Sequence, residues 1–279
     1  MENQTVKPAD QQEQLSNGGH YASVNGLKMY YEIHGTNQSA DQPPLVLLHG
    51  SLSATGTSFG QVLPLLEKTR KIIAVEQQAH GHTADIDRPL TIEQMGEDTV
   101  ALLRQLGIRQ ADFFGYSLGT GIALYIAIRH PAMVRKLALA GGVTYNRQGF
   151  HPGMLEGLDG LKPEYLVGSP FYDEYMQIAP RPEDFPRLIE KVKALNKTLH
   201  DWSPDEIRSI QAPTLLIIGD ADIVQPEHVV EMFRLLGGGV VGDNVGLPSA
   251  RLAILPGTTH VTLVQRADWL GSMLSEFFA

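Results

Sequence analysis

The chain has 279 residues, of which 43% are hydrophobic and 19% are charged, and its formal net charge is −9. This length suffices for one large α/β core with an inserted lobe, while the acidic balance argues against nucleic acid or an anionic membrane as a partner. The chain has no cysteine, which excludes disulfides and thiolate metal sites, and no apolar run approaches the length of a membrane span.

The N-terminal segment, residues 1–19, is rich in Gln, Asn, Asp and Glu and predicts a disordered arm. Residues 1–17 also lack the apolar core of a secretory signal peptide, so a cytoplasmic location is the default expectation. A mature secreted protein with an added Met1 would have the same sequence, and this alternative stays open.

Strand signals begin just after this arm. Residues 21–24 and 27–33 have β-type composition, and Asn25-Gly26 between them is a strong hairpin signal. Residues 43–48 form a continuous apolar run, as expected for a strand buried on both faces. Helix and strand signals then alternate, with helices at 59–67, 91–107 (opened by a capping-box pattern) and 122–128, and strands at 71–75, 111–114 and 136–140. The alternation predicts an α/β fold with a mostly parallel central sheet and helices on both faces.

The sequence Gly115-Tyr116-Ser117-Leu118-Gly119 lies between a predicted strand and a predicted helix. G-x-S-x-G in that setting is typical of a nucleophile elbow, a turn so tight that its glycines let neighbouring backbone approach closely. Such a turn would hold the Ser117 hydroxyl at the carboxyl end of the sheet, beside free N–H groups of the helix N-terminus. An ordinary glycine-rich turn is the alternative interpretation.

Residues 144–210 break the alternation with several prolines and glycines, short helical patterns and many Tyr, Phe, Met and Leu side chains. Long structureless loops are uncommon in compact domains, and these aromatic side chains need burial. We therefore predict a helical cap inserted over the carboxyl edge of the sheet; a long surface excursion is the alternative. The core is then residues 20–143 and 211–279, where strands at 213–218 and 251–255 and helices at 226–236 and 267–278 are predicted.

Catalytic groups in open α/β sheets collect beyond the carboxyl ends of the strands. The polar residues at those positions are His49, Ser51, Glu76, Ser117, Asp222 and His260. The last three follow the order Ser, Asp, His, which is the chain order of α/β-hydrolases. Asp220 lies at the same strand end as Asp222 and is the alternative acid.

On these motifs the chain resembles the α/β-hydrolase superfamily, and within it the capped bacterial serine esterase-like enzymes, over residues 21–278. The matching segments are His49-Gly50, the G-x-S-x-G elbow, Gly219-Asp220-Ala221-Asp222 and Gly257-Thr258-Thr259-His260. The resemblance implies that Ser117 is the nucleophile, Asp222 the acid and His260 the base. It also implies an oxyanion hole formed by the backbone N–H groups of Ser51 and Leu118.

The chain departs from the family's pattern after the fourth strand. Many relatives carry Asp-x-Arg-Gly-His-Gly-x-Ser there, whereas this chain has Glu76-Gln77-Gln78-Ala79-His80-Gly81-His82-Thr83. His80 and His82 suggest a metal site, but the metallo-hydrolase pattern H-x-H-x-D-H would need Asp at Ala84. We therefore predict a structural segment, and we expect neither a metal nor a cofactor.

Substrate contacts are predicted at six residues, although the aromatic and Met side chains of a cap also pack its own core: His49, Tyr116, Tyr165, Phe171, Tyr172 and Met176. Serine rather than aspartate at the elbow argues against haloalkane dehalogenases and epoxide hydrolases. We predict a serine hydrolase that cleaves small to medium neutral carboxylic esters or lactones through an acyl-enzyme. A cofactor-free perhydrolase of the haloperoxidase type and a hydrolase-fold receptor with little turnover are the alternatives, because a fold alone does not choose the chemistry.

Overall fold

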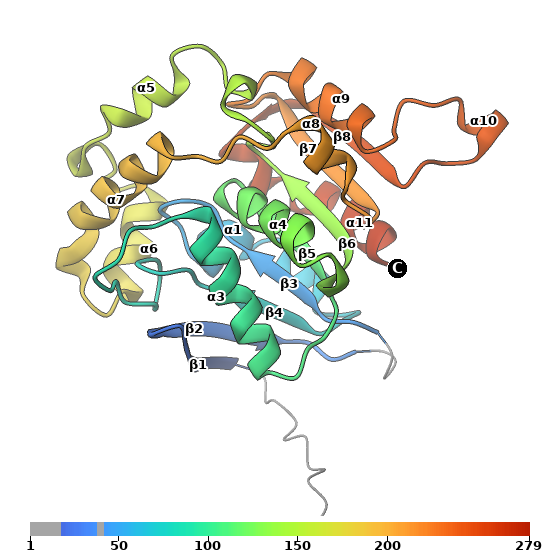
Figure 1. The fold of residues 1–279 in the computed structure, drawn as a ribbon. Coiled ribbons are helices and arrows are strands. Elements are labelled where there is room, and N and C mark those ends of the chain that lie inside the picture. The colour runs from blue at the N-terminus through green and yellow to red at the C-terminus, as the bar shows by residue number, and fades with distance from the viewer. Residues whose placement is uncertain (1–17, 38–41) are drawn as a thin grey trace, which may run out of the picture.

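A computed structural model of the chain describes residues 18–37 and 42–279. These residues form an eight-stranded sheet covered by helices (Figure 1). The strands are β1 (Gly18–Val24), β2 (Leu27–His34), β3 (Leu45–Leu48), β4 (Ile72–Val75), β5 (Ala111–Tyr116), β6 (Val134–Ala140), β7 (Thr214–Ala221) and β8 (Ala250–Thr259). The helices are α1 (Thr55–Phe59), α2 (Leu63–Leu66), α3 (Ile92–Gln105), α4 (Leu118–Arg129), α5 (Met154–Asp159), α6 (Pro170–Ile178), α7 (Phe185–Lys197), α8 (Pro204–Arg208), α9 (Pro226–Leu235), α10 (Gly242–Val245) and α11 (Ala267–Phe278).

The strand order β1-β2-β4-β3-β5-β6-β7-β8 confirms the predicted mostly parallel sheet. Only the first pairings are antiparallel, between β1 and β2 and between β2 and β4. Asn25 and Gly26 make the hairpin turn with φ values of 47° and 80°, because a two-residue turn of this hand needs positive φ at both positions. Gly18 and Gly19, which were predicted to belong to the N-terminal arm, are part of β1. The rest of that arm, residues 1–17, lies outside the residues that the structure describes.

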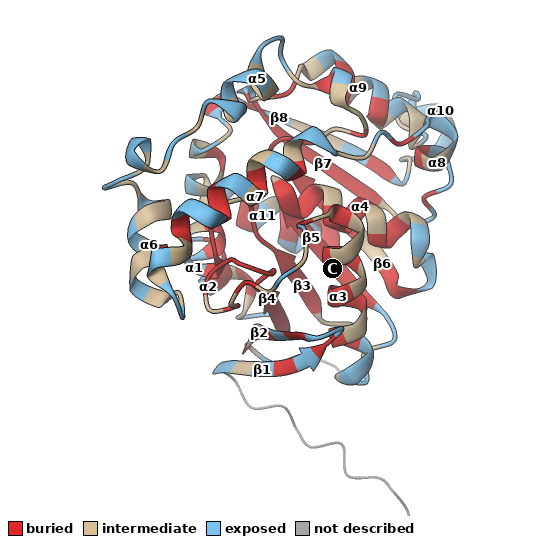
Figure 2. Ribbon diagram, turned by 60° about the vertical axis from the view of Figure 1, so that its left-hand side comes forward, coloured by how far each residue is buried: buried red, intermediate tan, exposed pale blue. Residues whose placement is uncertain are grey.

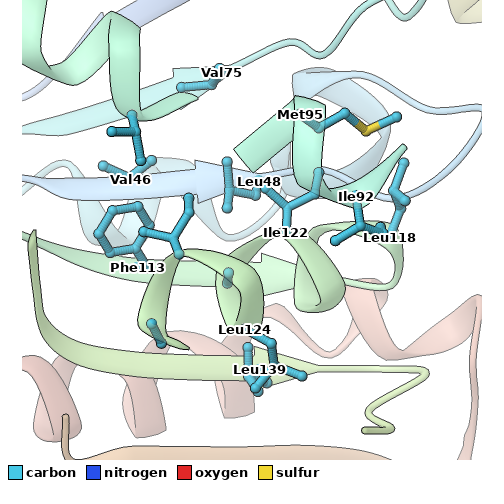
Figure 3. Packing of buried hydrophobic residues seen from close by; sticks show 14 of the residues in the cluster. Val46, Leu48, Val75, Ile92, Met95, Phe113, Leu118, Ile122, Leu124 and Leu139 are labelled. Carbon is cyan, nitrogen blue, oxygen red and sulfur yellow. The ribbon is translucent and has the colours of Figure 1, made fainter. Parts of the chain in front are cut away.

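Each face of the sheet is covered by its own set of helices. Alternate residues of β3 divide between the faces: Val46 and Leu48 pack in one apolar cluster, Leu45 and Leu47 in the other. The first cluster contains the apolar residues of α3 and α4, as Figure 3 shows, and the second contains those of α2 and α11. Figure 2 shows the buried strands between these layers. The sheet is therefore buried between two apolar layers.

The structure refines three predicted elements. Of the helix predicted at 59–67, only residues 63–66 form a helix, α2, with Pro64 in its first turn; the separate helix α1 ends at Phe59, just before Gly60. The α3 cap is half of the predicted capping box: the Thr91 hydroxyl accepts the Gln94 backbone N–H, while the Gln94 side chain donates to Asp98. The last strand extends to Thr259, well beyond the predicted end at residue 255.

Residues 144–210, which we call the cap segment, run from β6 to β7 without adding a strand to the sheet. They include α5, α6 and α7, which lie together beyond one end of the sheet in Figure 1. The two ends of the cap segment are joined by a hydrogen bond from the Trp202 N–H to the Tyr145 carbonyl at 2.8 Å. After Trp202, α8 packs against α9 of the core. Among the described helices, none is both long and apolar enough to cross a membrane.

Candidate active site

Ser117 lies at the turn between β5 and α4, with φ of 53° and ψ of −116°. A positive φ is costly for a residue with a side chain, so the surrounding backbone must hold it. The two glycines of the motif make this possible. A Cβ at Gly115 would collide with the Gly119 carbonyl oxygen, and a Cβ at Gly119 would collide with the Leu48 carbonyl oxygen on β3. The turn therefore has the geometry of a nucleophile elbow.

The side chains of Ser117, His260 and Asp222 form an unbroken hydrogen-bonded series. His260 Nε2 lies 2.9 Å from Ser117 Oγ, and His260 Nδ1 lies 2.9 Å from Asp222 Oδ1. Asp222 follows β7 directly and His260 follows β8 directly. Parallel strands end at one edge of the sheet, so three residues far apart in the chain meet there.

The carboxylate of Asp222 is held in place and kept ionised. Burial opposes its ionisation, but the His260 side chain and the backbone N–H groups of Gly142 (3.0 Å) and Ile223 (2.7 Å) outweigh it and keep the pKa of Asp222 below its ordinary value. Asp220 is exposed and accepts the N–H groups of Gly257 and Thr258, so it braces the turn before His260. Of the two aspartates, the structure places Asp222 against the histidine.

Tyr116 contacts the same histidine through both its hydroxyl and its ring. Its hydroxyl donates to the His260 carbonyl oxygen at 2.9 Å, and its ring stacks on the imidazole with the ring centroids 5.4 Å apart. The side chain is only 3% exposed, so neither contact competes with bulk water. Tyr116 also lines the cavity, as predicted, but its polar atom is directed to the histidine backbone.

The two predicted oxyanion donors both border Ser117. Leu118 is the first residue of α4, where backbone N–H groups have no partner inside the helix. Ser51 lies in the loop after β3, and both residues line one cavity with Ser117 and His260. The neighbouring Leu52 has a φ of 59°, a strained value for a residue with a side chain.

The cavity has a volume of about 370 Å³ and opens on Ser117. Its wall is predominantly apolar and includes helices of both the core and the cap segment. The apolar lining residues are Leu52, Ile92, Leu118, Phe150, Met154, Leu155, Leu158, Leu161, Leu166, Phe171, Val192, Leu199, Trp202, Ile223 and Val261. Lys193 and His200 also line it, but each is paired with a glutamate, Glu190 and Glu93 respectively. The cavity therefore favours an apolar occupant.

Two of the six predicted substrate contacts, Tyr116 and Phe171, line this cavity, and four do not among the described lining residues. Tyr165 is 68% exposed to solvent. Tyr172 packs edge-on against Phe185, and Met176 packs on the main apolar cluster. His49 is fully buried behind the loop that carries Ser51.

Sequence reasoning missed most of the cavity wall. The helical spacing of some lining residues is visible in the sequence. Met154, Leu155 and Leu158 share one face of α5. Val192 and Asn196 lie one turn apart on α7. The sequence does not show which face of a cap helix turns to the cavity, because that depends on how the helices pack.

His49 and His80 are buried and neutral, with ring centroids 5.0 Å apart. Burial lowers the pKa of His49 to about 3, and His80 adds to this effect. Burial also lowers the pKa of His80 to about 4. His49 Nδ1–H donates to the Gly50 carbonyl and Nε2 accepts the Gln77 N–H, so the ring is held as one tautomer. His49 thus buttresses the loop from behind.

The one group of possible metal ligands found among the described residues is Glu32, Glu76 and His82, whose ligand atoms lie within 4.8 Å of one another. Each already has a protein partner. Glu76 accepts the backbone N–H and Nδ1–H of His82, and Glu32 contacts Tyr30 and His34. His80 does not belong to this group. That this segment is structural stays a prediction.

Comparison with known families adds to this geometry. The family described as the alpha/beta hydrolase fold matches residues 43–267, which is most of the chain. The chain belongs to this family. It is similar to the uncharacterized hydrolase YugF of Bacillus subtilis (strain 168), with 22% identity over 91% of this chain and 96% of that protein. It is also similar to a non-heme haloperoxidase of Rhodococcus erythropolis, with 23% identity over 91% of this chain and 96% of that protein.

Among solved structures, this alpha/beta hydrolase resembles the enol-lactonase from Burkholderia xenovorans LB400. The TM-score is 0.67 at 22% identity, and the match covers 92% of this chain and 99% of that one. At this identity the likeness shows the fold, and the chemistry must be argued from the site.

Proposed function

We propose that this enzyme hydrolyses small to medium neutral carboxylic esters or lactones through an acyl-enzyme. The observation that carries the proposal is the hydrogen-bonded series of Ser117, His260 and Asp222, which ends in an apolar cavity. Lactones are included among the proposed substrates because a solved structure with the same fold is described as an enol-lactonase.

The proposed mechanism follows from these contacts. His260 Nε2 takes the proton as Ser117 Oγ attacks the carbonyl carbon. Asp222 fixes the tautomer that leaves Nε2 free and stabilises the imidazolium that forms. The carbonyl oxygen becomes an anion, and we assign its stabilisation to the N–H groups of Ser51 and Leu118, because donors held by the fold need no reorganisation when the charge forms. The alcohol leaves with the proton from His260, and water then attacks the acyl-enzyme in the same way.

The test uses a fluorophosphonate probe and a p-nitrophenyl ester. We expect the probe to label the peptide that contains Ser117, and Ser117→Ala to abolish both labelling and turnover. The matched control is Ser275→Ala, an exposed serine on α11 that should change neither. Labelling of another residue, or activity in Ser117→Ala, would refute the nucleophile assignment. Binding of the ester without turnover would favour the receptor alternative.

A second candidate is perhydrolysis, which the similarity to a haloperoxidase over nearly the full length of both chains favours. Hydrogen peroxide would replace water as the nucleophile: the acyl group passes from Ser117 to the peroxide oxygen, and His260 takes and returns the proton. No cofactor is needed for this step. Peracid formation from acetate and peroxide that exceeds every ester hydrolysis rate would favour this candidate over the first.

A further inference from the structure

Glu174, on α6 of the cap segment, is bonded to the first turn of α1 in the core. Its carboxylate accepts the backbone N–H of Ala54 at 3.0 Å and that of Thr57 at 2.9 Å, and it also accepts the Thr57 hydroxyl. From the core side, the buried Glu76 accepts the Thr55 N–H at 3.4 Å. Two carboxylates, one of them from the cap segment, thus hold this turn.

The same turn is bonded to the loop that carries Ser51. The Ser58 hydroxyl on α1 accepts the Gly50 N–H at 3.2 Å and lies 2.7 Å from the Ser53 hydroxyl. The Ser53 hydroxyl donates to the Gly50 carbonyl at 2.8 Å. These bonds fix the peptides on both sides of Gly50, and the second of these peptides carries the Ser51 N–H. They are needed because Leu52 has a positive φ, which the loop adopts only when its surroundings hold it.

We propose that Glu174 is a positioning residue that couples the seating of the cap segment to the orientation of the Ser51 N–H. The contacts are continuous from Glu174 through α1 and Ser58 to Gly50. The oxyanion hole is then complete only when α6 lies on α1, with the cap segment closed over the cavity. This inference rests on the proposed function, since it assigns a role to an oxyanion donor.

A second contact between cap segment and core supplies the control. The Lys191 ammonium on α7 lies 2.6 Å from Asp85 and also donates to the carbonyl oxygens of Ile86 and Arg88. Of these groups, none belongs to the loop that carries Ser51 or to α1. Lys191→Met therefore loosens α7 from the core while leaving Glu174 bonded to α1, whereas Glu174→Ala removes the bonds between α6 and α1.

The experiment compares kinetics with the binding of two ketones of the same shape. A trifluoromethyl ketone forms a tetrahedral oxyanion with the serine, whereas the matching methyl ketone binds as the neutral carbonyl. For Glu174→Ala we expect kcat to fall by about tenfold to a hundredfold, below the loss for removing a donor outright. Affinity for the trifluoromethyl ketone should fall by a similar factor, and affinity for the methyl ketone should hardly change. Glu174→Gln keeps an acceptor oxygen and should recover part of the loss.

The pattern across the variants decides the matter. Equal losses for both ketones with kcat unchanged would overturn the proposal, because Glu174 would then only shape the cavity. Equal losses of kcat in Lys191→Met and Glu174→Ala would also overturn it, because the bonds of Glu174 to α1 would then matter no more than any other contact between the cap segment and the core. If Glu174→Ala does not fold, Glu174→Gln must still show a smaller loss confined to kcat and the trifluoromethyl ketone. Wild-type labelling at Ser117 is scored separately, so failure of the proposed function is distinguishable.

Discussion

Acid should destabilise this protein through His49 and His80, which fold as neutral rings. Burial lowers the pKa of His49 to about 3 and that of His80 to about 4. Below the ordinary histidine pKa of about 6.5, the unfolded chain binds a proton that the native ring refuses. The free energy of unfolding therefore falls as the pH drops below about 6.5, and the fall ends near the lowered pKa of each ring.

The magnitude follows from the size of the pH step. One pH unit is worth about 1.36 kcal/mol per proton, so at about pH 5 each ring removes about 2 kcal/mol of stability, and the two together remove about 4 kcal/mol. This is a large part of the total stability of a typical protein. A proton on His49 Nε2 would also face the Gln77 N–H, which now donates to that atom.

Urea unfolding followed by the fluorescence of the buried Trp202 measures this effect at about pH 7 and about pH 5. His49→Gln is expected to be less stable than wild type at neutral pH, yet to lose about 2 kcal/mol less on acidification. The matched control is His151→Gln, which removes an exposed histidine and touches neither buried ring. An undiminished pH dependence in His49→Gln would refute the reasoning.

Three further outcomes are expected. Asp222→Asn should lower kcat by orders of magnitude, because an amide neither fixes the His260 tautomer nor stabilises its charge. Asp220→Asn should lower kcat only slightly, and the reverse order in steady-state kinetics would assign the acid to Asp220. Tyr116→Phe removes one hydrogen bond to the His260 backbone and should lower kcat by about tenfold with KM little changed. A change in KM alone would mean that Tyr116 only lines the cavity. A series of neutral esters should show kcat/KM rising by up to about fourfold per added methylene until the cavity is filled, as about 0.8 kcal/mol per buried CH₂ implies, and a flat series would contradict an apolar pocket.

The order of the elements and the elbow were predictable because they depend on local sequence. Continuous apolar runs mark strands buried on both faces, and Gly115 and Gly119 stand where any Cβ would meet backbone. The strand ends then indicate Asp222 and His260, since parallel strands deliver their carboxyl ends to one edge. The resemblance already implied Asp222 rather than Asp220 as the acid, but only the structure shows which group each of the two side chains faces.

The cavity wall was less predictable because it depends on packing between distant segments. Tyr172 packs against Phe185 rather than lining the cavity, and Tyr165 is exposed to solvent. Both are aromatic residues of the kind that often contacts a substrate. His49 directly follows an apolar strand, as other site residues do, but its ring accepts the Gln77 N–H instead of facing the cavity. Glu174 gave no signal in the sequence, because its partners lie far away in the chain at α1.

The most direct test of the account is to trap the acyl-enzyme. The wild-type protein is mixed with a p-nitrophenyl ester, quenched in acid within the first turnover and analysed by peptide mass spectrometry. The proposed mechanism predicts one equivalent of p-nitrophenol in a burst and the mass of one acyl group on the peptide that contains Ser117, both absent in Ser117→Ala. Turnover with no acyl adduct, or an adduct on another residue, would contradict it.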